Sequence, residues 1–256
     1  SMSISTFSGL SLKVGKFIWV VGHSGTETAE DIRTHFGIFA PGVTQLFPNG
    51  HIINIHPWEH NEVAPALATA LNTDVSLIAI HLTRPPIMIP DRNSMGMDSH
   101  LCASKGAYLI KDYDTARPNE GVVIVRGTSS TNSLVEILPN LRKEGPNVKV
   151  ISAISWELFK RQPHKYRQTL ITDSEWNDSM IITNGAKRLM HKWIANSIVE
   201  EYSMSPDFDN RWRTGGSVEQ IVAESHLDSN SILDGIRRFA SDRPKRLSRL
   251  RENLAY

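Results

Sequence analysis

The sequence contains a single cysteine, Cys102, among 256 residues, so it cannot form a disulfide bond within the chain. Long apolar runs are also missing, because the longest, such as residues 17–21 and 76–82, fall far short of the roughly 20 residues that span a bilayer. No amino-terminal stretch has the order of basic, apolar and small residues that marks a secretory signal. These absences predict a cytoplasmic protein in a reducing environment, with no membrane partner.

An excess of either charge is missing as well. Lys and Arg number 28 against 27 Asp and Glu, which leaves a formal net charge of +1. Such a balance offers no broad field for a polyanion, so we expect no nucleic-acid partner. Of all residues 40% are hydrophobic, which suits one large domain or two modest ones with a sizeable core.

Several common catalytic motifs do not occur. The sequence has no Gly-x-Gly-x-x-Gly and no Gly-x-x-x-x-Gly-Lys-Ser/Thr, which disfavours the usual nicotinamide and nucleoside-triphosphate sites. Gly-Thr-Ser-Ser at residues 127–130 resembles a phosphate-binding turn only weakly. Gly-x-Ser-x-Gly is also absent, which disfavours a serine hydrolase of the α/β type.

Short apolar runs rich in β-branched residues alternate with stretches of helical period, a pattern typical of a mostly parallel sheet covered by helices. Early in the chain, residues 16–21 are predicted as a buried strand, with further strands at 49–55 and 75–82 and a helix at 61–71 between them. The proline-rich residues 84–90 cannot be helical, so we place a domain boundary after them.

A second alternation begins at Gly106. The expected strands are residues 107–111, 121–126, 147–153 and 180–183. The expected helices are residues 130–144, 156–161, 186–201, 218–226 and 231–242. The basic tail from Arg243 is predicted to be a solvated helix end. The fold class is therefore α/β, with two three-layer α/β/α units at residues 3–92 and 106–256, joined by a linker at 93–105.

Two histidines, His23 and His35, bracket a polar segment that follows the first predicted strand. Ligand groups gather where parallel strands end, and His23 stands two residues beyond such an end. Because residues 26–34 are rich in Thr, Glu and Asp, we expect them to be too polar for the core. Imidazoles that move protons, with carboxylates that accept bonds from hydroxyls, suit a polyhydroxylated substrate. A plain solvated loop is the alternative.

Arg84 follows the strand at 75–82, so its fork of donors lies at the same edge of the sheet as His23. A phosphate or carboxylate partner fits it, and so does the carboxyl end of a helix. A zinc site at His51, His56 and His60 is disfavoured, because the His-Glu-x-x-His pattern and a second cysteine are missing. No metal site is expected.

The remaining groups have plainer interpretations. Residues 56–60 are interpreted as a packed strand-to-helix turn that Trp58 anchors. Cys102 has neither a neighbouring base nor a helix amino terminus that the sequence identifies, so we interpret it as inert.

The order of His23, Glu30-Asp31 and Thr34-His35 resembles the transketolase signature His-Asp-Ser-x-Gly-x-Gly-Glu-Asp-Gly-Pro-Thr-His, in register without a gap. The preceding Phe-Ile-Trp-Val-Val is similar to the strand that leads into that motif in the family. Pro57 with Asn61-Glu-Val63 resembles Arg-Pro-Ala-Asp-x-Asn-Glu-Val.

Further matches extend the resemblance over nearly the whole chain. Leu82-Thr-Arg84 is similar to the family's Leu-Ser-Arg, and residues 106–239 look like its carboxy-terminal domain, including Thr214-Gly-Gly. The fold this implies is the end of a pyrimidine-binding domain followed by a transketolase C-terminal domain.

The resemblance implies roles at matching positions. His23, Asp31 and His35 would contact a sugar, with His35 and His23 as the catalytic residues, and Arg84 would hold the sugar's phosphate. It implies transfer of a two-carbon ketol unit between sugar phosphates in pentose-phosphate metabolism, with thiamine diphosphate and a divalent metal as cofactors of the full-length protein. We expect a homodimer.

The chain departs from the family at Ser24, residues 26–29, Ile32-Arg33 and His56, which leaves the length and phosphorylation of the sugar open. The family's activating glutamate, its aromatic clamp and its Gly-Asp-Gly do not occur in the sequence. We therefore expect a fragment that needs a missing amino-terminal region or subunit, binds no cofactor by itself and is inactive alone. The alternatives are a non-catalytic assembly module, or part of a pyruvate-dehydrogenase-type enzyme or deoxyxylulose-phosphate synthase.

Overall fold

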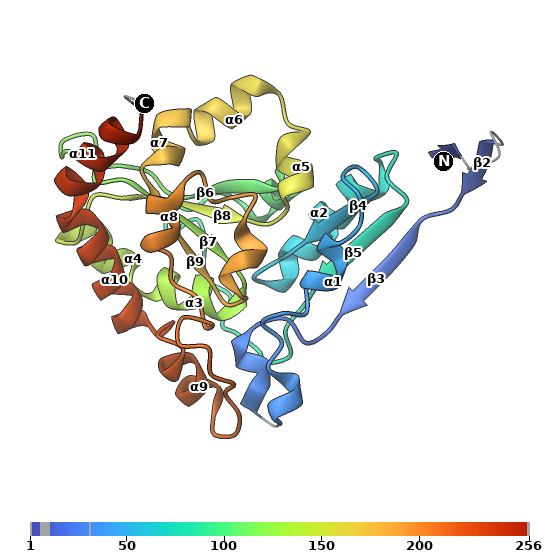
Figure 1. Ribbon diagram of the computed structural model, residues 1–256, viewed down its shortest axis with the longest axis horizontal. Helices are drawn as coiled ribbons and strands as arrows, with labels where there is room; N and C mark the ends of the chain where they lie inside the picture. The colour runs from blue at the N-terminus through green and yellow to red at the C-terminus, as the bar shows by residue number, and fades with distance from the viewer. Residues whose placement is uncertain (1, 6–10, 31, 255–256) are drawn as a thin grey trace.

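The structure is a computed structural model, in which residues 2–5, 11–30 and 32–254 are described. Two sheets of mostly parallel strands lie next to each other, and helices surround the second of them (Figure 1). The strands are β1 (Met2–Ser5), β2 (Ser11–Val14), β3 (Phe17–Val21), β4 (Ile52–Ile55), β5 (Leu77–His81), β6 (Ala107–Lys111), β7 (Val122–Arg126), β8 (Lys149–Ala153) and β9 (Ser179–Thr183). The α/β class with mostly parallel sheets is confirmed.

The helices are mostly short. The α-helices are α1 (Gly42–Gln45), α2 (Val63–Leu71), α3 (Thr128–Glu136), α4 (Leu138–Lys143), α5 (Trp156–Lys160), α6 (His164–Leu170), α7 (Asp173–Asn177), α8 (Ser197–Glu201), α9 (Val218–Glu224), α10 (Ser229–Ser241) and α11 (Arg243–Leu254). The 3-10 helices are η1 (Thr26–Glu30), η2 (Arg33–His35), η3 (His60–Glu62), η4 (His100–Lys105) and η5 (Lys187–Met190).

The first sheet has the order β3-β5-β4, and both of its pairings are parallel. All three carboxyl ends therefore meet at one edge, where Val21 pairs with His81 and Ile55 with Ile80. Alternate side chains of β4 and β5 pack against α2 in the main hydrophobic core. This alignment brings the loops that follow β3 and β5 to the same place.

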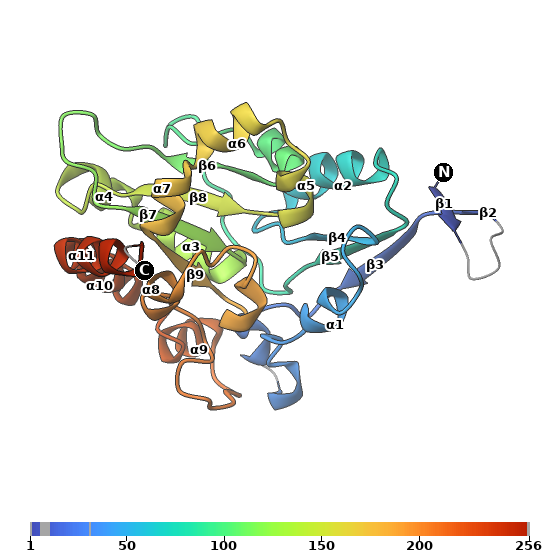
Figure 2. The same ribbon diagram turned by 45° about the horizontal axis from the view of Figure 1, so that its top comes forward.

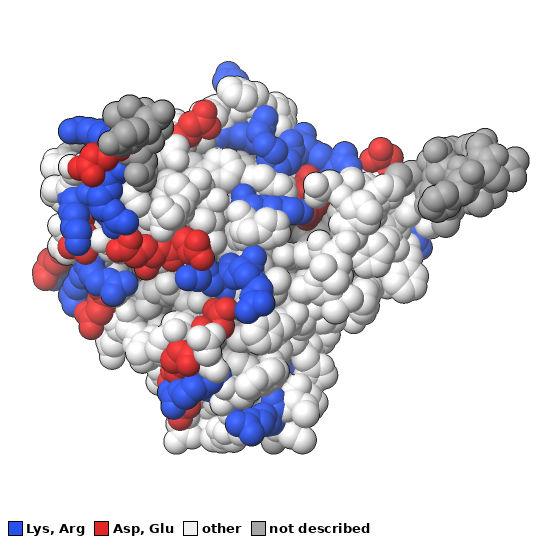
Figure 3. Space-filling model, viewed as in Figure 1, with Lys and Arg blue, Asp and Glu red and all other residues white. Residues whose placement is uncertain are grey.

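The prediction that residues 16–21 form a buried strand is wrong in its burial. β3 is an edge strand, and Phe17 is 59% exposed, Trp19 38% and Val20 58%. An unbroken apolar run predicts a strand that is covered on both faces, but it does not say which chain segment covers it. In Figure 3 the surface toward the β3 end of the molecule is largely uncharged, whereas Lys, Arg, Asp and Glu gather over the second sheet's half.

The second sheet has the order β6-β8-β7-β9. β7, β8 and β9 run parallel, and β6 pairs with β8 in the antiparallel sense. Every residue of β7, β8 and β9 is buried, which explains why Val and Ile occupy the centre of each strand. α10 and α11 lie along the far side of this sheet from β3 (Figures 1 and 2).

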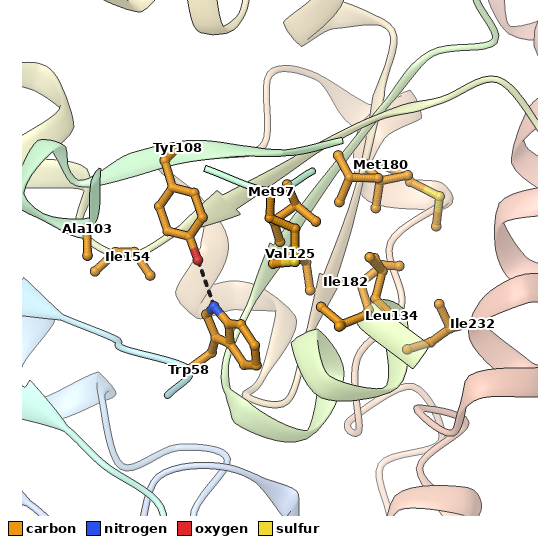
Figure 4. Packing of buried hydrophobic residues seen from close by; sticks show 14 of the residues in the cluster. Trp58, Met97, Ala103, Tyr108, Val125, Leu134, Ile154, Met180, Ile182 and Ile232 are labelled. Carbon is orange, nitrogen blue, oxygen red and sulfur yellow. Dashed lines mark hydrogen bonds between the residues drawn. The ribbon is translucent and has the colours of Figure 1, made fainter. Parts of the chain in front are cut away.

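One polar network joins the two sheets inside the core. Trp58 Nε1 donates to Tyr108 Oη at 2.7 Å (Figure 4). Tyr108 in turn donates to the Glu62 carboxylate. Arg92 Nη2 lies 2.8 Å from Glu62 Oε1 and 2.7 Å from Glu59 Oε1. Trp58 is 1% exposed, as expected for the residue that anchors this turn. Buried charges of this kind are tolerated because each has its partners.

Two predicted helices are interrupted. Residues 130–144 divide into α3 and α4 at Ile137, with Pro139 near the start of α4. The helix predicted at 186–201 is wrong, because only η5 and α8 are helical there. The Leu189 carbonyl, which a helix would use internally, accepts instead from Gln45 Nε2 at 2.9 Å and Arg126 Nη1 at 3.1 Å. Helices α6 and α7 were not predicted.

The basic tail is not merely solvated. Arg246 of α11 is 1% exposed, donates to the Asp178 carboxylate and lies with its guanidinium 3.5 Å from the centre of the Phe239 ring. Arg243 Nε donates to the same carboxylate at 2.7 Å. A charge pattern alone could not show this, since the partner lies more than 60 residues away in the sequence.

Replacing Arg246 with Met should lower the free energy of unfolding by about 3 kcal/mol, because it leaves a buried carboxylate short of its main partner. Urea denaturation measures the change. Arg251→Met, at an exposed position of the same helix, should change it by less than about 0.5 kcal/mol. Equal losses in the two variants would show that the docking of α11 does not depend on this ion pair.

Candidate functional site

The loops after β3 and β5 are joined by backbone hydrogen bonds just beyond the strand ends. Leu82 N donates to Val21 O at 2.8 Å, and Ser24 N donates to Leu82 O at 2.9 Å. These two bonds extend the pairing of β3 with β5 beyond the ends of the strands. His23 and Arg84 therefore lie next to each other at the same edge of the sheet.

The loop from His23 to Gly37 closes on itself. Gly25 N donates to Gly37 O at 3.3 Å, and a Cβ at Gly37 would stand 1.8 Å from His23 O. Only glycine permits that approach. Thr28 Oγ1 donates to Gly25 O at 2.8 Å and also contacts His35 O, which holds the second histidine over the start of the loop.

Three of the predicted site residues come together here. The rings of His23 and His35 lie 4.5 Å apart between centroids. Arg84 Nη2 lies 3.4 Å from His35 Nδ1 and 3.4 Å from Thr28 O. Both histidines are half-buried and Arg84 is exposed. Asp31, the fourth predicted residue, lies outside the described residues. The roles assigned to these side chains remain predictions.

The prediction that residues 26–34 are too polar for the core is wrong for the first part of the segment. Thr26 and Thr28 are fully buried and Glu27 is 1% exposed. Glu27 takes its partners from the second sheet's half, because it accepts from Ser129 Oγ and Asn184 Nδ2, each at 2.8 Å. Burial raises the pKa of Glu27, against the lowering effect of these hydrogen bonds. The sequence offered no signal for these partners, because they lie more than 100 residues away.

Sequence reasoning also missed a cluster beneath this edge. The rings of His56 and His81 are stacked 4.4 Å apart, next to Arg126, which is 5% exposed. Burial, and then the charge of Arg126, lowers the pKa of His81 to about 3, and the same causes hold the pKa of His56 well below its ordinary value. Burial also lowers the pKa of Arg126 to about 10. Both imidazoles are therefore neutral at physiological pH.

A small cavity of about 20 Å³ lies within this cluster, large enough for one water molecule. Ser24 and Thr83 line it together with His81 and Arg126. Among the described residues, the Ser24 and Thr83 hydroxyls and His81 Nδ1 have no hydrogen-bond partner in the protein. The cavity is the place where a water would satisfy them.

The other histidines considered as metal ligands are separated. His51 and His60 are exposed, whereas His56 is buried. Within residues 2–5, 11–30 and 32–254, no group of three His, Cys, Asp or Glu side chains could hold a metal ion. In the same ranges, no helix combines the length and apolar character that crossing a bilayer requires.

Comparisons with known proteins agree with this architecture. Residues 106–205 match the transketolase-like TK C-terminal domain family. Transketolase 7 of Craterostigma plantagineum is 29% identical over 163 residues, which cover 63% of this chain and 23% of that protein. The chloroplastic transketolase of Zea mays is 31% identical over 157 residues, covering 60% and 22%.

Solved transketolases share the fold. The enzyme from Leishmania mexicana superposes with a TM-score of 0.69 at 20% identity, covering 89% of this chain and 30% of that one. A complex of the Pichia stipitis enzyme with sedoheptulose 7-phosphate superposes with a TM-score of 0.68 at 18% identity, covering 88% and 30%.

Residues 106–205 thus form an α/β domain of the transketolase-like C-terminal class. The sequence of the chain is similar to the C-terminal part of transketolases, and solved transketolases share its fold. It spans 20–29% of the length of the curated relatives it matches.

The lowered pKa of His81 predicts a loss of stability in acid. The folded state favours the neutral ring, so its contribution is complete above the ordinary pKa of 6.5 and is lost as the pH falls toward about 3. In urea denaturation between pH 6 and 4.5, His81→Gln should make the pH dependence of the unfolding free energy shallower by about 1.4 kcal/mol per pH unit. His51→Gln, at an exposed position, should keep the slope of the unmodified protein. A slope unchanged by His81→Gln would contradict the prediction.

Proposed function

We propose that this chain provides the sugar-binding side of a transketolase-type active site, in an enzyme that transfers a two-carbon ketol unit between sugar phosphates. The observation that carries the proposal is the convergence of His23, His35 and Arg84 where β3 and β5 end. Two imidazoles and a guanidinium at one edge combine proton transfer with recognition of a phosphate.

The geometry suggests a division of roles. Because the Arg84 guanidinium always donates, His35 Nδ1 accepts from it, and a neutral His35 carries its proton on Nε2. That nitrogen then donates to a sugar carbonyl or hydroxyl oxygen and exchanges the proton with it. We propose that Arg84 and His23 bind the phosphate end. The role of Asp31, which lies outside the described residues, comes from the resemblance alone, and there it would accept from a sugar hydroxyl.

Thiamine diphosphate would supply the carbon–carbon bond chemistry in such an enzyme. The described residues do not fit its metal and diphosphate, since they contain no metal-binding group and the buried Glu27 carboxylate is already held by Ser129 and Asn184. We propose that another polypeptide region holds it, and that this chain by itself transfers no ketol units.

A second candidate, an assembly module, is favoured by the exposed edge strand. Phe17, Ile18, Trp19 and Val20 are all between 38% and 59% exposed, which is the character of a surface that pairs with another polypeptide. Sedimentation velocity at several concentrations tests self-association, including the proposed homodimer. The cytoplasmic location stays a prediction, because several similar transketolases are chloroplastic.

His35→Ala, introduced into the enzyme assembled with its cofactor-binding region, should lower ketol-transfer turnover by roughly 10²-fold, the usual scale for an acid–base group. Steady-state kinetics with a ketose phosphate donor measures it. His51→Ala, an exposed histidine outside this edge, is the matched control. Turnover that His35→Ala leaves unchanged would remove His35 from the mechanism.

The isolated chain should bind a sugar phosphate through the same edge, with Arg84 providing most of the attraction. Arg84→Gln should weaken the binding of fructose 6-phosphate by about 10-fold or more, whereas binding of unphosphorylated fructose should be unaffected. Calorimetric titration of the unmodified chain and of the variant with each sugar measures the two affinities. Equal weakening for both sugars would show that Arg84 does not bind the phosphate.

A further inference from the structure

A second cationic cluster lies at the opposite end of β7 from Arg126. Lys111 ends β6, Arg117 lies in the loop that leads to β7, and Arg142 stands in the last turn of α4. Together they line a cavity of about 230 Å³. The length of β7 separates this cavity from Arg126 by roughly 13 Å along the strand.

None of the three cations has an ion-pair partner within the described residues. Lys111 is 5% exposed, and its Nζ donates to Asp112 O at 3.1 Å and to Val148 O at 2.9 Å. A protonated ammonium has three donors, so one is left over. Arg117 donates through Nη2 to Gly145 O. The Arg142 side chain makes no hydrogen bond among the described residues.

The acidic side chains of the cavity are already engaged. Asp112 Oδ1 accepts from Tyr113 N at 2.8 Å, and Asp114 Oδ1 accepts from Ala116 N at 2.9 Å. Burial lowers the pKa of Lys111 to about 8, and the charges of Arg117 and Arg142 lower it further than the two aspartates raise it. The three cations of the cavity outnumber its two carboxylates, so the field around the Lys111 ammonium stays positive, and a bound anion would offset it.

We propose that this cavity binds a phosphate group, either free phosphate or that of a small phosphate monoester, between Lys111, Arg117 and Arg142. Guanidinium forks match the oxygens of a tetrahedral anion, and a buried ammonium adds a point charge beneath them. The volume accommodates a phosphate with a few further heavy atoms. The inference does not rest on the proposed sugar site.

The test uses thermal unfolding of the whole chain at constant ionic strength, with 10 mM sodium phosphate or glycerol 3-phosphate replacing chloride. Every protein carries Arg84→Gln, so that phosphate bound at the candidate sugar site does not contribute. Either phosphate compound should raise the Tm by about 2–4 °C if it binds in the millimolar range. Stabilisation by glycerol 3-phosphate alone would identify a monoester as the ligand.

The added variants Arg142→Gln and Lys143→Gln are matched, because they remove one exposed charge from adjacent positions of α4, and Lys143 does not line the cavity. Arg142→Gln should lose at least half of the shift, and Lys143→Gln should keep it. No shift with either compound, or the same shift in both variants, would overturn the proposal.

Discussion

The candidate site depends most directly on the hydrogen bonds that the buried Glu27 carboxylate accepts from the second sheet's half. It lies in the loop between the two site histidines, and it accepts from Ser129 at the start of α3 and from Asn184 after β9. A carboxylate at a helix amino terminus is stabilised by the free backbone donors there, and Ser129 N provides one at 3.3 Å. The loop that carries His23 and His35 is therefore positioned by the second sheet as much as by the first.

Glycine makes this contact sterically possible. A Cβ at Gly25 would stand 2.3 Å from Asn184 Nδ2, and one at Gly127 would stand 1.7 Å from Asn184 Oδ1. Both glycines also have positive φ angles, 112° and 97°. Asn184 thus fits between two backbones that only glycine allows to approach, and its amide is held where it can reach Glu27.

Beneath the candidate site, the buried Arg126 carries a positive charge, whereas the neighbouring His56 and His81 are neutral. His56 and His81 lose their charge through burial and the nearby guanidinium, so one positive centre remains under the strand ends. The negative charge of Glu157 raises the pKa of Arg126, but Glu157 Oε1 also accepts a hydrogen bond from Lys192 Nζ at 2.8 Å. The resulting potential favours an anionic ligand at this edge of the sheet.

Much of this arrangement followed from the sequence, because parallel strands place their carboxyl ends together: the spacing of His23 and Arg84 from their strands was enough to predict that they meet. The positions of β3 to β9 were also predictable, since β-branched runs are local, whereas β1 and β2 were not predicted. Burial was not. Whether β3 is covered, whether Thr26 to Thr28 lie in the core, and whether Arg246 is solvated all depend on residues distant in sequence. Only the tertiary structure supplies those partners, and a hydrogen bond to a distant residue leaves no periodic signal in the chain.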